Sequence, residues 1–120
     1  MFGGILKSIM QVEFSPSLLE ERESVLRQSG CRVISVLGCG EVQGLTLAAL
    51  NIGVIVIGHG APWCERQELV TQFRKEKPAV VIVSLLRSTD EPFSEADFNI
   101  PADNPPLWER TVLQALTGLQ

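Results

Sequence analysis

The chain has 120 residues, an apolar content of 45% and a net charge of −4, which leaves room for one domain with one core. The acidic balance and the lack of a basic run disfavour nucleic acid as a direct partner. No apolar run approaches the roughly 20 residues that span a bilayer, and the start MFGGILKS lacks the basic region of a signal peptide, so we expect a cytoplasmic protein without membrane contact.

The first quarter of the chain predicts a strand, a helix and a second strand. Ser8–Val12 is a short apolar run. Ser15-Pro16 is typical of a helix start, and the segment Pro16–Gln28 carries leucines and valine at helical spacing. Gly30 supplies a C-terminal stop. Arg32–Leu37 then predicts the second strand.

The second quarter contains the most informative segment, NIGVIVIGHGAP. Gly38-Cys39-Gly40 is expected as an exit loop and Glu41–Leu50 as a short helix. Val54–Ile57 is continuously β-branched, which is typical of a strand buried on both faces of a parallel sheet. Gly58-His59-Gly60 follows at its carboxyl end, where ligands of open α/β sheets usually bind.

The second half repeats this alternation. Glu65–Lys75 predicts a helix, and Ala79–Leu85 a further doubly buried strand. Asp97–Ile100 is a weak last strand, and Pro105 opens a helix to about Leu116. Between the last two strands, the segment LLRSTDEPFSEA contains a central proline and is too short for a full helix.

Strands that alternate with helices form a parallel sheet through right-handed crossovers. We therefore expect one doubly wound α/β domain over residues 1–120, with five parallel strands in the order 2-1-3-4-5. Its fourth helix should be shortened or absent. The three cysteines, an odd number without paired spacing, favour a reducing compartment over a disulfide framework.

This layout resembles the receiver domain of bacterial two-component response regulators over essentially the whole chain. The segments that carry the resemblance are IMQVEFSPSLLEERESVL, CRVISVLGCGEVQGLTLAAL, IGVIVIGHGAPW, AVVIVSLL and FNIPADNPPLWERTVLQAL. The resemblance implies a flavodoxin-like fold and a role in signal transduction. In that family an acidic pair ends the first strand, a phosphorylated aspartate the third, a serine or threonine the fourth and a lysine the fifth.

At the positions that match this family, most of the chemistry is missing. The matching residues are Glu13, Phe14, Gly58, Ser84 and Pro101. Only the glutamate and the serine keep the expected type, and phosphoryl transfer to a carboxylate needs both an acceptor and the oxygen ligands of Mg²⁺. The resemblance therefore implies a degenerate receiver without the phosphoacceptor aspartate. We expect no cofactor, no metal and no catalysis, and an output that depends on binding an unidentified protein.

Side chains at the same sheet end leave other functions open. His59 and Gly60 are candidates for an anion or small-molecule site, because consecutive backbone N–H groups can form an anion-binding nest. Cys39, His59 and Cys64 combine ligand types that suit Zn²⁺, or a Cys–His nucleophile, but their spacing is irregular. Ordinary alternatives are a solvated histidine and gap-filling cysteines. An enzyme is the least favoured of the three classes.

The remaining expectations concern aromatic residues and surfaces. Trp63 either forms a contact surface or covers the sheet end. Glu13 is expected as a solvated carboxylate at the rim, and Ser84 as a hydroxyl bonded to backbone. The stunted fourth helix predicts an uncovered apolar seam and a two-fold homodimer. The residues expected at that seam are Phe93, Phe98, Leu107 and Trp108. Alternatively, Phe93 closes the gap within one chain.

Overall fold

The computed structural model describes residues 7–118 and forms one parallel five-stranded sheet in the order β2-β1-β3-β4-β5. The first six residues, which belong to the segment used to judge a leader, lie outside the described residues. The strands are β1 (Ser8–Glu13), β2 (Val33–Leu37), β3 (Ile52–Ile57), β4 (Val81–Leu86) and β5 (Phe98–Pro101). The predicted fold class and strand order are confirmed.

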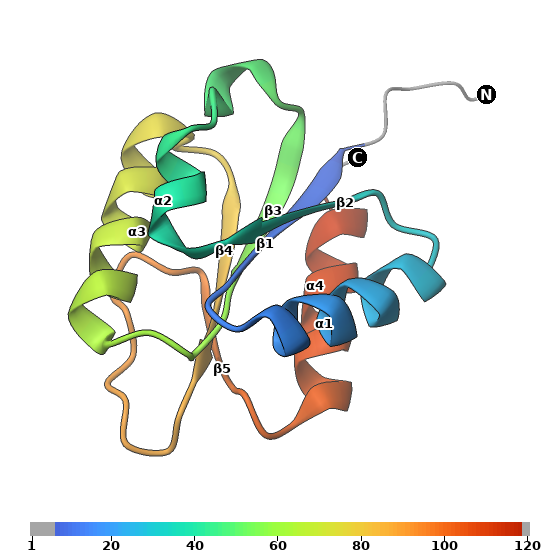
Figure 1. Cartoon of the computed structure of the whole chain (residues 1–120). Helices are drawn as coiled ribbons and strands as arrows, with labels where there is room; N and C mark the ends of the chain where they lie inside the picture. The colour runs from blue at the N-terminus through green and yellow to red at the C-terminus, as the bar shows by residue number, and fades with distance from the viewer. Residues whose placement is uncertain (1–6, 119–120) are drawn as a thin grey trace.

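Two helices cover each face of the sheet (Figure 1). The helices are α1 (Pro16–Gln28), α2 (Gly38–Gln43), α3 (Trp63–Glu76) and α4 (Pro105–Thr117), with a 3₁₀ turn at Leu47–Ala49. One apolar cluster, around Ile55 and Phe73, lies under α2 and α3, and the other, around Val56 and Val112, lies under α1 and α4. Side chains alternate between these two clusters along each strand, so the central strands are buried on both faces.

The second helix differs from its prediction. The sequence predicts a loop at Gly38-Cys39-Gly40 and a helix over Glu41–Leu50, but α2 starts at Gly38 and ends at Gln43. Gly38 has a φ of 78°, a left-handed conformation that glycine adopts without strain and that turns the chain directly out of β2. The Glu41 carboxylate accepts a hydrogen bond from the Leu37 N–H (2.7 Å), which satisfies a free donor at the helix start. This local bond compensates for the poor helix propensity of two glycines.

No helix forms between β4 and β5, as predicted. The intervening loop, residues 87–97, folds back over the α3 side of the sheet end, where it forms the lower left of the molecule in Figure 1. Phe93 is 1% exposed and packs into the apolar cluster under α3. The loop therefore takes the place of a covering helix and closes the gap within one chain.

This closure corrects the expected dimer seam. Phe93 and Trp108 are buried inside the chain, because the first fills the gap above β4 and the second packs between α4 and α1. Phe98 remains 42% exposed and Leu107 is half-buried. Self-association stays a prediction that now depends on Phe98 and Leu107 alone.

None of the helices among residues 7–118 has the length and apolar character needed to cross a bilayer.

Candidate functional site

The carboxyl ends of β1 and β3 meet around the side chain of Glu13. Glu13 is the last residue of β1 and is fully buried (0% exposed), so its predicted place at the solvated rim is wrong. Its carboxylate forms an ion pair with the guanidinium of Arg22, which projects from α1 and is also buried. Burial raises the pKa of the Glu13 carboxyl above its usual value, while the neighbouring Arg22 charge opposes that shift.

The Glu13 carboxylate fills the space that a side chain at position 58 would need. A Cβ atom added to Gly58 would lie closer than 3.0 Å to the carboxylate carbon and both oxygens of Glu13. The backbone N–H of Gly58 donates to the Val12 carbonyl (2.8 Å), which holds the strand ends together at this point. Any larger residue at position 58 would therefore force the buried Glu13 carboxylate to move away from its place beside Arg22.

The other positions that match the receiver pattern add no second carboxylate to that of Glu13. Phe14 is half-buried and packs against the apolar cluster, while Pro101 is exposed at the end of β5. The Ser84 hydroxyl is buried and has no hydrogen-bond partner among the described residues, so the predicted bond to backbone is not formed. With Glu13 paired to Arg22, the set does not fit a magnesium ion, which needs several free oxygen ligands.

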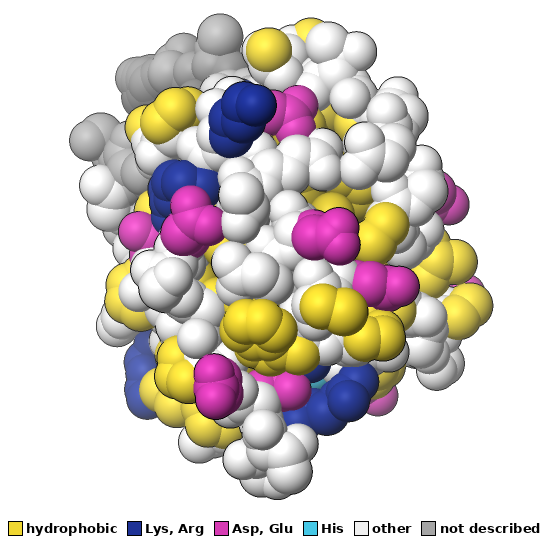
Figure 2. Space-filling model, turned by 90° about the vertical axis from the view of Figure 1, so that its left-hand side faces the viewer, with side chains coloured by type: hydrophobic (Ala, Val, Ile, Leu, Met, Phe, Trp, Pro, Cys, Tyr) yellow, Lys and Arg dark blue, Asp and Glu magenta, His cyan; other side chains and the backbone are white. Residues whose placement is uncertain are grey.

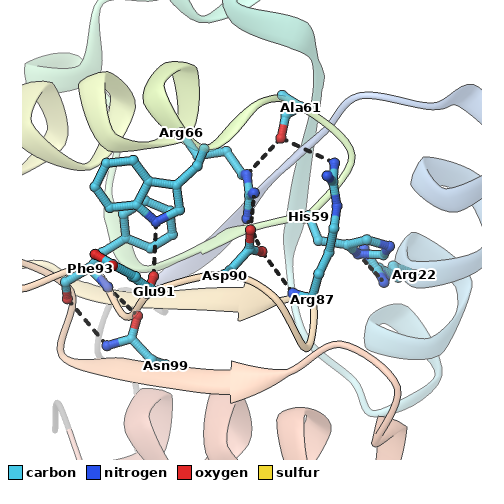
Figure 3. Close-up of polar contacts among 10 residues, drawn as sticks. Arg22, His59, Ala61, Arg66, Arg87, Asp90, Glu91, Phe93 and Asn99 are labelled. Atoms are coloured by element: carbon cyan, nitrogen blue, oxygen red, sulfur yellow. Dashed lines mark hydrogen bonds and ion pairs between the residues drawn. The ribbon is translucent and has the colours of Figure 1, made fainter.

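His59 lies between two arginines at this sheet end (Figure 3). The Nη2 atom of Arg22 lies 3.5 Å from its Nδ1 atom, and since a guanidinium can only donate, this contact favours the tautomer with the proton on Nε2. Burial and the charges of Arg22, Arg87 and Arg66 lower the pKa of His59 below its ordinary value of 6.5. Burial and these positive charges therefore disfavour the protonated imidazole.

We expect His59 to titrate below pH 6.5 and to make the fold less stable in acid. The unfolded chain takes up a proton before the folded chain does, so stability should fall as the pH drops from 6.5 through the folded pKa. The chain contains one histidine, so an NMR titration of its ring protons gives the value directly. His59→Gln should remove this pH dependence, and a folded pKa at or above 6.5 would contradict the described surroundings.

The remaining candidate residues do not form one site. Cys39 lines a depression between α2 and α3, together with Gln43, Glu65, Glu68, Leu69 and Gln72, whereas His59 lines a different one at the ends of β4 and β5. Cys64 is exposed. Within residues 7–118, no group of three or more metal-ligating side chains is close enough to hold a metal ion. Gly58 and Gly60 also lack the left-handed backbone conformation of an alternating nest.

A second buried arginine fixes the loop of residues 87–97. Arg66 of α3 is 0% exposed, and its two terminal nitrogens bind the two carboxylate oxygens of Asp90 at 2.8 and 2.9 Å, as Figure 3 shows. Its Nε atom donates to the Ala61 carbonyl (2.8 Å). The hydrogen bonds that Arg66 donates hold the pKa of the Asp90 carboxyl below its usual value. This bidentate pair joins the loop to both α3 and the segment that follows β3.

Aromatic and backbone contacts secure the same loop. The rings of Trp63 and Phe93 stack with centroids 5.0 Å apart and an interplanar angle of 11°. The Trp63 indole N–H donates to the Glu91 carbonyl (2.8 Å), which favours the covering role of Trp63 over a free contact surface. The side chain of Asn99 on β5 bonds both the N–H and the carbonyl of Phe93. The loop is therefore held to α3 on one side and to β5 on the other.

The sequence analysis missed the two arginines, although their positions carried a signal. Arg22 lies four residues after Leu18 and four before Leu26, on the inward face of α1. Arg66 stands three residues before Leu69 and four before Val70, on the inward face of α3. A charged residue at a helix position that faces the core is buried only with a partner. The positions of the two arginines therefore predict that each forms a buried ion pair, but they do not identify the acidic partner.

Comparison with solved structures identifies the fold. A CheY-like response regulator receiver domain from Methanospirillum hungatei superposes with a TM-score of 0.80 at 19% identity, over 95% of this chain and 96% of that one. The response regulator TrrA of Thermotoga maritima, solved in complex with Mg²⁺–BeF, gives 0.77 at 19% identity, over 92% and 99%. TrrA in complex with the histidine kinase ThkA gives 0.75 at 18% identity, over 92% and 99%.

These likenesses establish that the chain has the receiver fold, as its sequence pattern predicted. No known family pattern matches the chain, and no curated protein matches it in sequence.

Proposed function

We propose that this chain is a receiver-like signalling module that accepts no phosphoryl group and acts by binding a protein partner. One observation carries the proposal: the buried Glu13 carboxylate, paired with Arg22, occupies the space above Gly58. In the receiver pattern, this is where an aspartate would project to receive the phosphoryl group. The ion pair between Glu13 and Arg22 thus occupies the place where the receiver pattern has its phosphorylation site.

The fixed loop supports a module with a permanent surface. Receiver signalling in the family pattern uses the face formed by the fourth helix, fifth strand and fifth helix. Here that face is built from the loop of residues 87–97, β5 and α4, and the bonds of Arg66, Trp63 and Asn99 hold the loop in one arrangement. A protein of this fold, TrrA, has been solved in complex with a histidine kinase. We propose that the present chain offers a partner a surface that does not change with phosphorylation.

The same contacts support a role without catalysis. His59 makes its side-chain contact with Arg22, and Cys64 is exposed. A nucleophile needs a base within hydrogen-bond reach and a third group that orients the base. Because Arg22 occupies Nδ1 and is itself paired with Glu13, the imidazole is not arranged to activate Cys64. We therefore propose that the chain works by binding alone.

Treatment with acetyl phosphate and Mg²⁺ should leave the protein unmodified on any aspartate or glutamate. The expected intact mass is that of the untreated chain, because the carboxylate nearest to the acceptor position is buried and ion-paired. A receiver domain with an intact aspartate, treated in parallel, is the positive control. A mass increase of one phosphoryl group that is lost after hydroxylamine treatment, as acyl phosphates are, would overturn the proposal.

A further inference from the structure

A depression of about 220 Å³ opens at the carboxyl ends of β4 and β5, beside the site already described. Its lining comes from three separate strand ends: His59 follows β3, Leu86 to Ser88 end and follow β4, and Ala102 and Asp103 follow β5. None of the receiver-pattern positions lines it. At this size it takes a metabolite of a few heavy atoms, since sites for larger ligands usually measure 300–1,000 Å³.

Two residues of the lining carry hydrogen-bond donors. Arg87 forms no ion pair among the described residues; its guanidinium donates one bond to the Ala61 carbonyl at 3.3 Å, which leaves most of its five N–H groups free. The contact of Arg22 with Nδ1 favours the His59 tautomer with its proton on Nε2. A cationic fork beside an imidazole N–H donor is an arrangement that binds carboxylate or phosphate oxygens.

A third residue of the lining is an acid. Asp103 is exposed in the segment between β5 and α4, and it forms no ion pair among residues 7–118. Arg87 and Asp103 therefore line one depression, and neither forms an ion pair among residues 7–118, although the Arg87 charge also acts on the Asp90 carboxylate. A simple anion would be attracted by the first and repelled by the second, whereas a ligand with a charge at each end would satisfy both.

We propose that this depression binds a small zwitterion, with its anionic group on Arg87 and His59 and its ammonium group on Asp103. The site goes beyond the proposed protein-binding role, since none of the receiver-pattern positions lines it, although Arg87 and Ser88 belong to the loop of residues 87–97. It would make this module responsive to a metabolite in place of a phosphoryl group. The anionic group can be a phosphate or a carboxylate, because Arg87 accommodates both.

The test compares four probes by amide and histidine-ring NMR shifts on the full chain. Phosphoethanolamine and β-alanine carry both charges, inorganic phosphate carries only the anion, and ethanolamine only the cation. We expect saturable shifts at His59, Arg87 and Asp103 with at least one zwitterion, and binding about two- to fivefold weaker for both single-charge probes. The preferred zwitterion tells whether the anionic group is a phosphate or a carboxylate.

Two variants and a control assign the binding to these residues. Arg87→Gln should weaken the preferred zwitterion by about tenfold or more, because charge-assisted hydrogen bonds are lost. Asp103→Asn should weaken the zwitterion but leave inorganic phosphate unchanged or tighter. Arg110→Gln removes a charge of the same sign from an exposed position on α4 and should change nothing. No shift with any probe, equal affinity for phosphate alone, or binding that survives Arg87→Gln would each overturn the proposal.

Discussion

Replacing Gly58 by alanine should destabilise this protein by about 3 to 5 kcal/mol, the usual cost of breaking a buried ion pair. The added methyl group would occupy the position of the Glu13 carboxylate. Glu13 would have to turn away, and both it and Arg22 would then be buried without a partner. Urea unfolding measures the loss, as a lower midpoint with an unchanged slope.

Making the same Gly58→Ala substitution in a protein without the ion pair distinguishes displacement of Glu13 from the general effect of replacing a glycine. In a Glu13→Ala, Arg22→Met protein both charges are absent, and replacing a buried pair by apolar groups is often nearly neutral. Gly58→Ala should then cost less than about 1 kcal/mol in that background, since neighbouring substitutions that share a contact are not additive. Gly60→Ala is a useful comparison, because its added Cβ would lie 3.3 Å from the Cβ of Phe14 and touch no charge. An equal cost of Gly58→Ala in both backgrounds would refute the role assigned to Glu13.

Asp90→Ala should release the loop of residues 87–97 and cost about 3 to 5 kcal/mol, because it leaves the fully buried guanidinium of Arg66 unpaired. Amide hydrogen exchange across the loop should become faster, while β1 and β3 should keep their protection relative to global unfolding. Glu91→Ala, in the same loop, is the matched control. Its side chain is exposed and only its backbone carbonyl is used, so a change within about 0.5 kcal/mol is expected.

The contribution of Asp90 to the free energy of unfolding should also depend on pH. Its pKa in the folded protein lies below the ordinary value of 3.8, chiefly because Arg66 donates to it. The stabilisation is therefore fully present above pH 3.8 and is lost as the pH falls through the folded pKa. The difference in stability between the natural chain and Asp90→Ala should shrink over that range. Adding Arg66→Met to Asp90→Ala should restore part of the loss, and a stable Asp90→Ala protein with an unchanged loop would contradict this arrangement.

The fold was predictable because its signals are local. The β-branched run Val54–Ile57 marks a strand buried on both faces, and α1 begins at Pro16 and ends at Gln28 as its proline start and Gly30 stop indicate. The absence of a helix between β4 and β5 followed from the short segment around Pro92. The start of α2 was not predictable from propensity, because one hydrogen bond from Leu37 to the Glu41 side chain decides it.

The site was less predictable because its parts are distant in sequence. The sequence shows that position 58 has no carboxylate, but not that Glu13 fills the space from a neighbouring strand. Arg22 lies 9 residues from Glu13, and Arg66 lies 24 residues from Asp90. Such pairs form only after the sheet has brought its strand ends together. Helix periodicity places both arginines on inward faces, but their partners depend on strand order and loop path.

The amide NMR spectrum, recorded with and without beryllofluoride and Mg²⁺, tests most directly whether the receiver site has been replaced by an internal ion pair. Beryllofluoride imitates a phosphoryl group and reports binding without covalent chemistry. We predict no change at Glu13, Gly58 or Ser84 at concentrations that saturate an ordinary receiver domain. Saturable shifts at these three residues, lost on removal of Mg²⁺, would show that the site still binds a phosphoryl-like group and would contradict the proposed function.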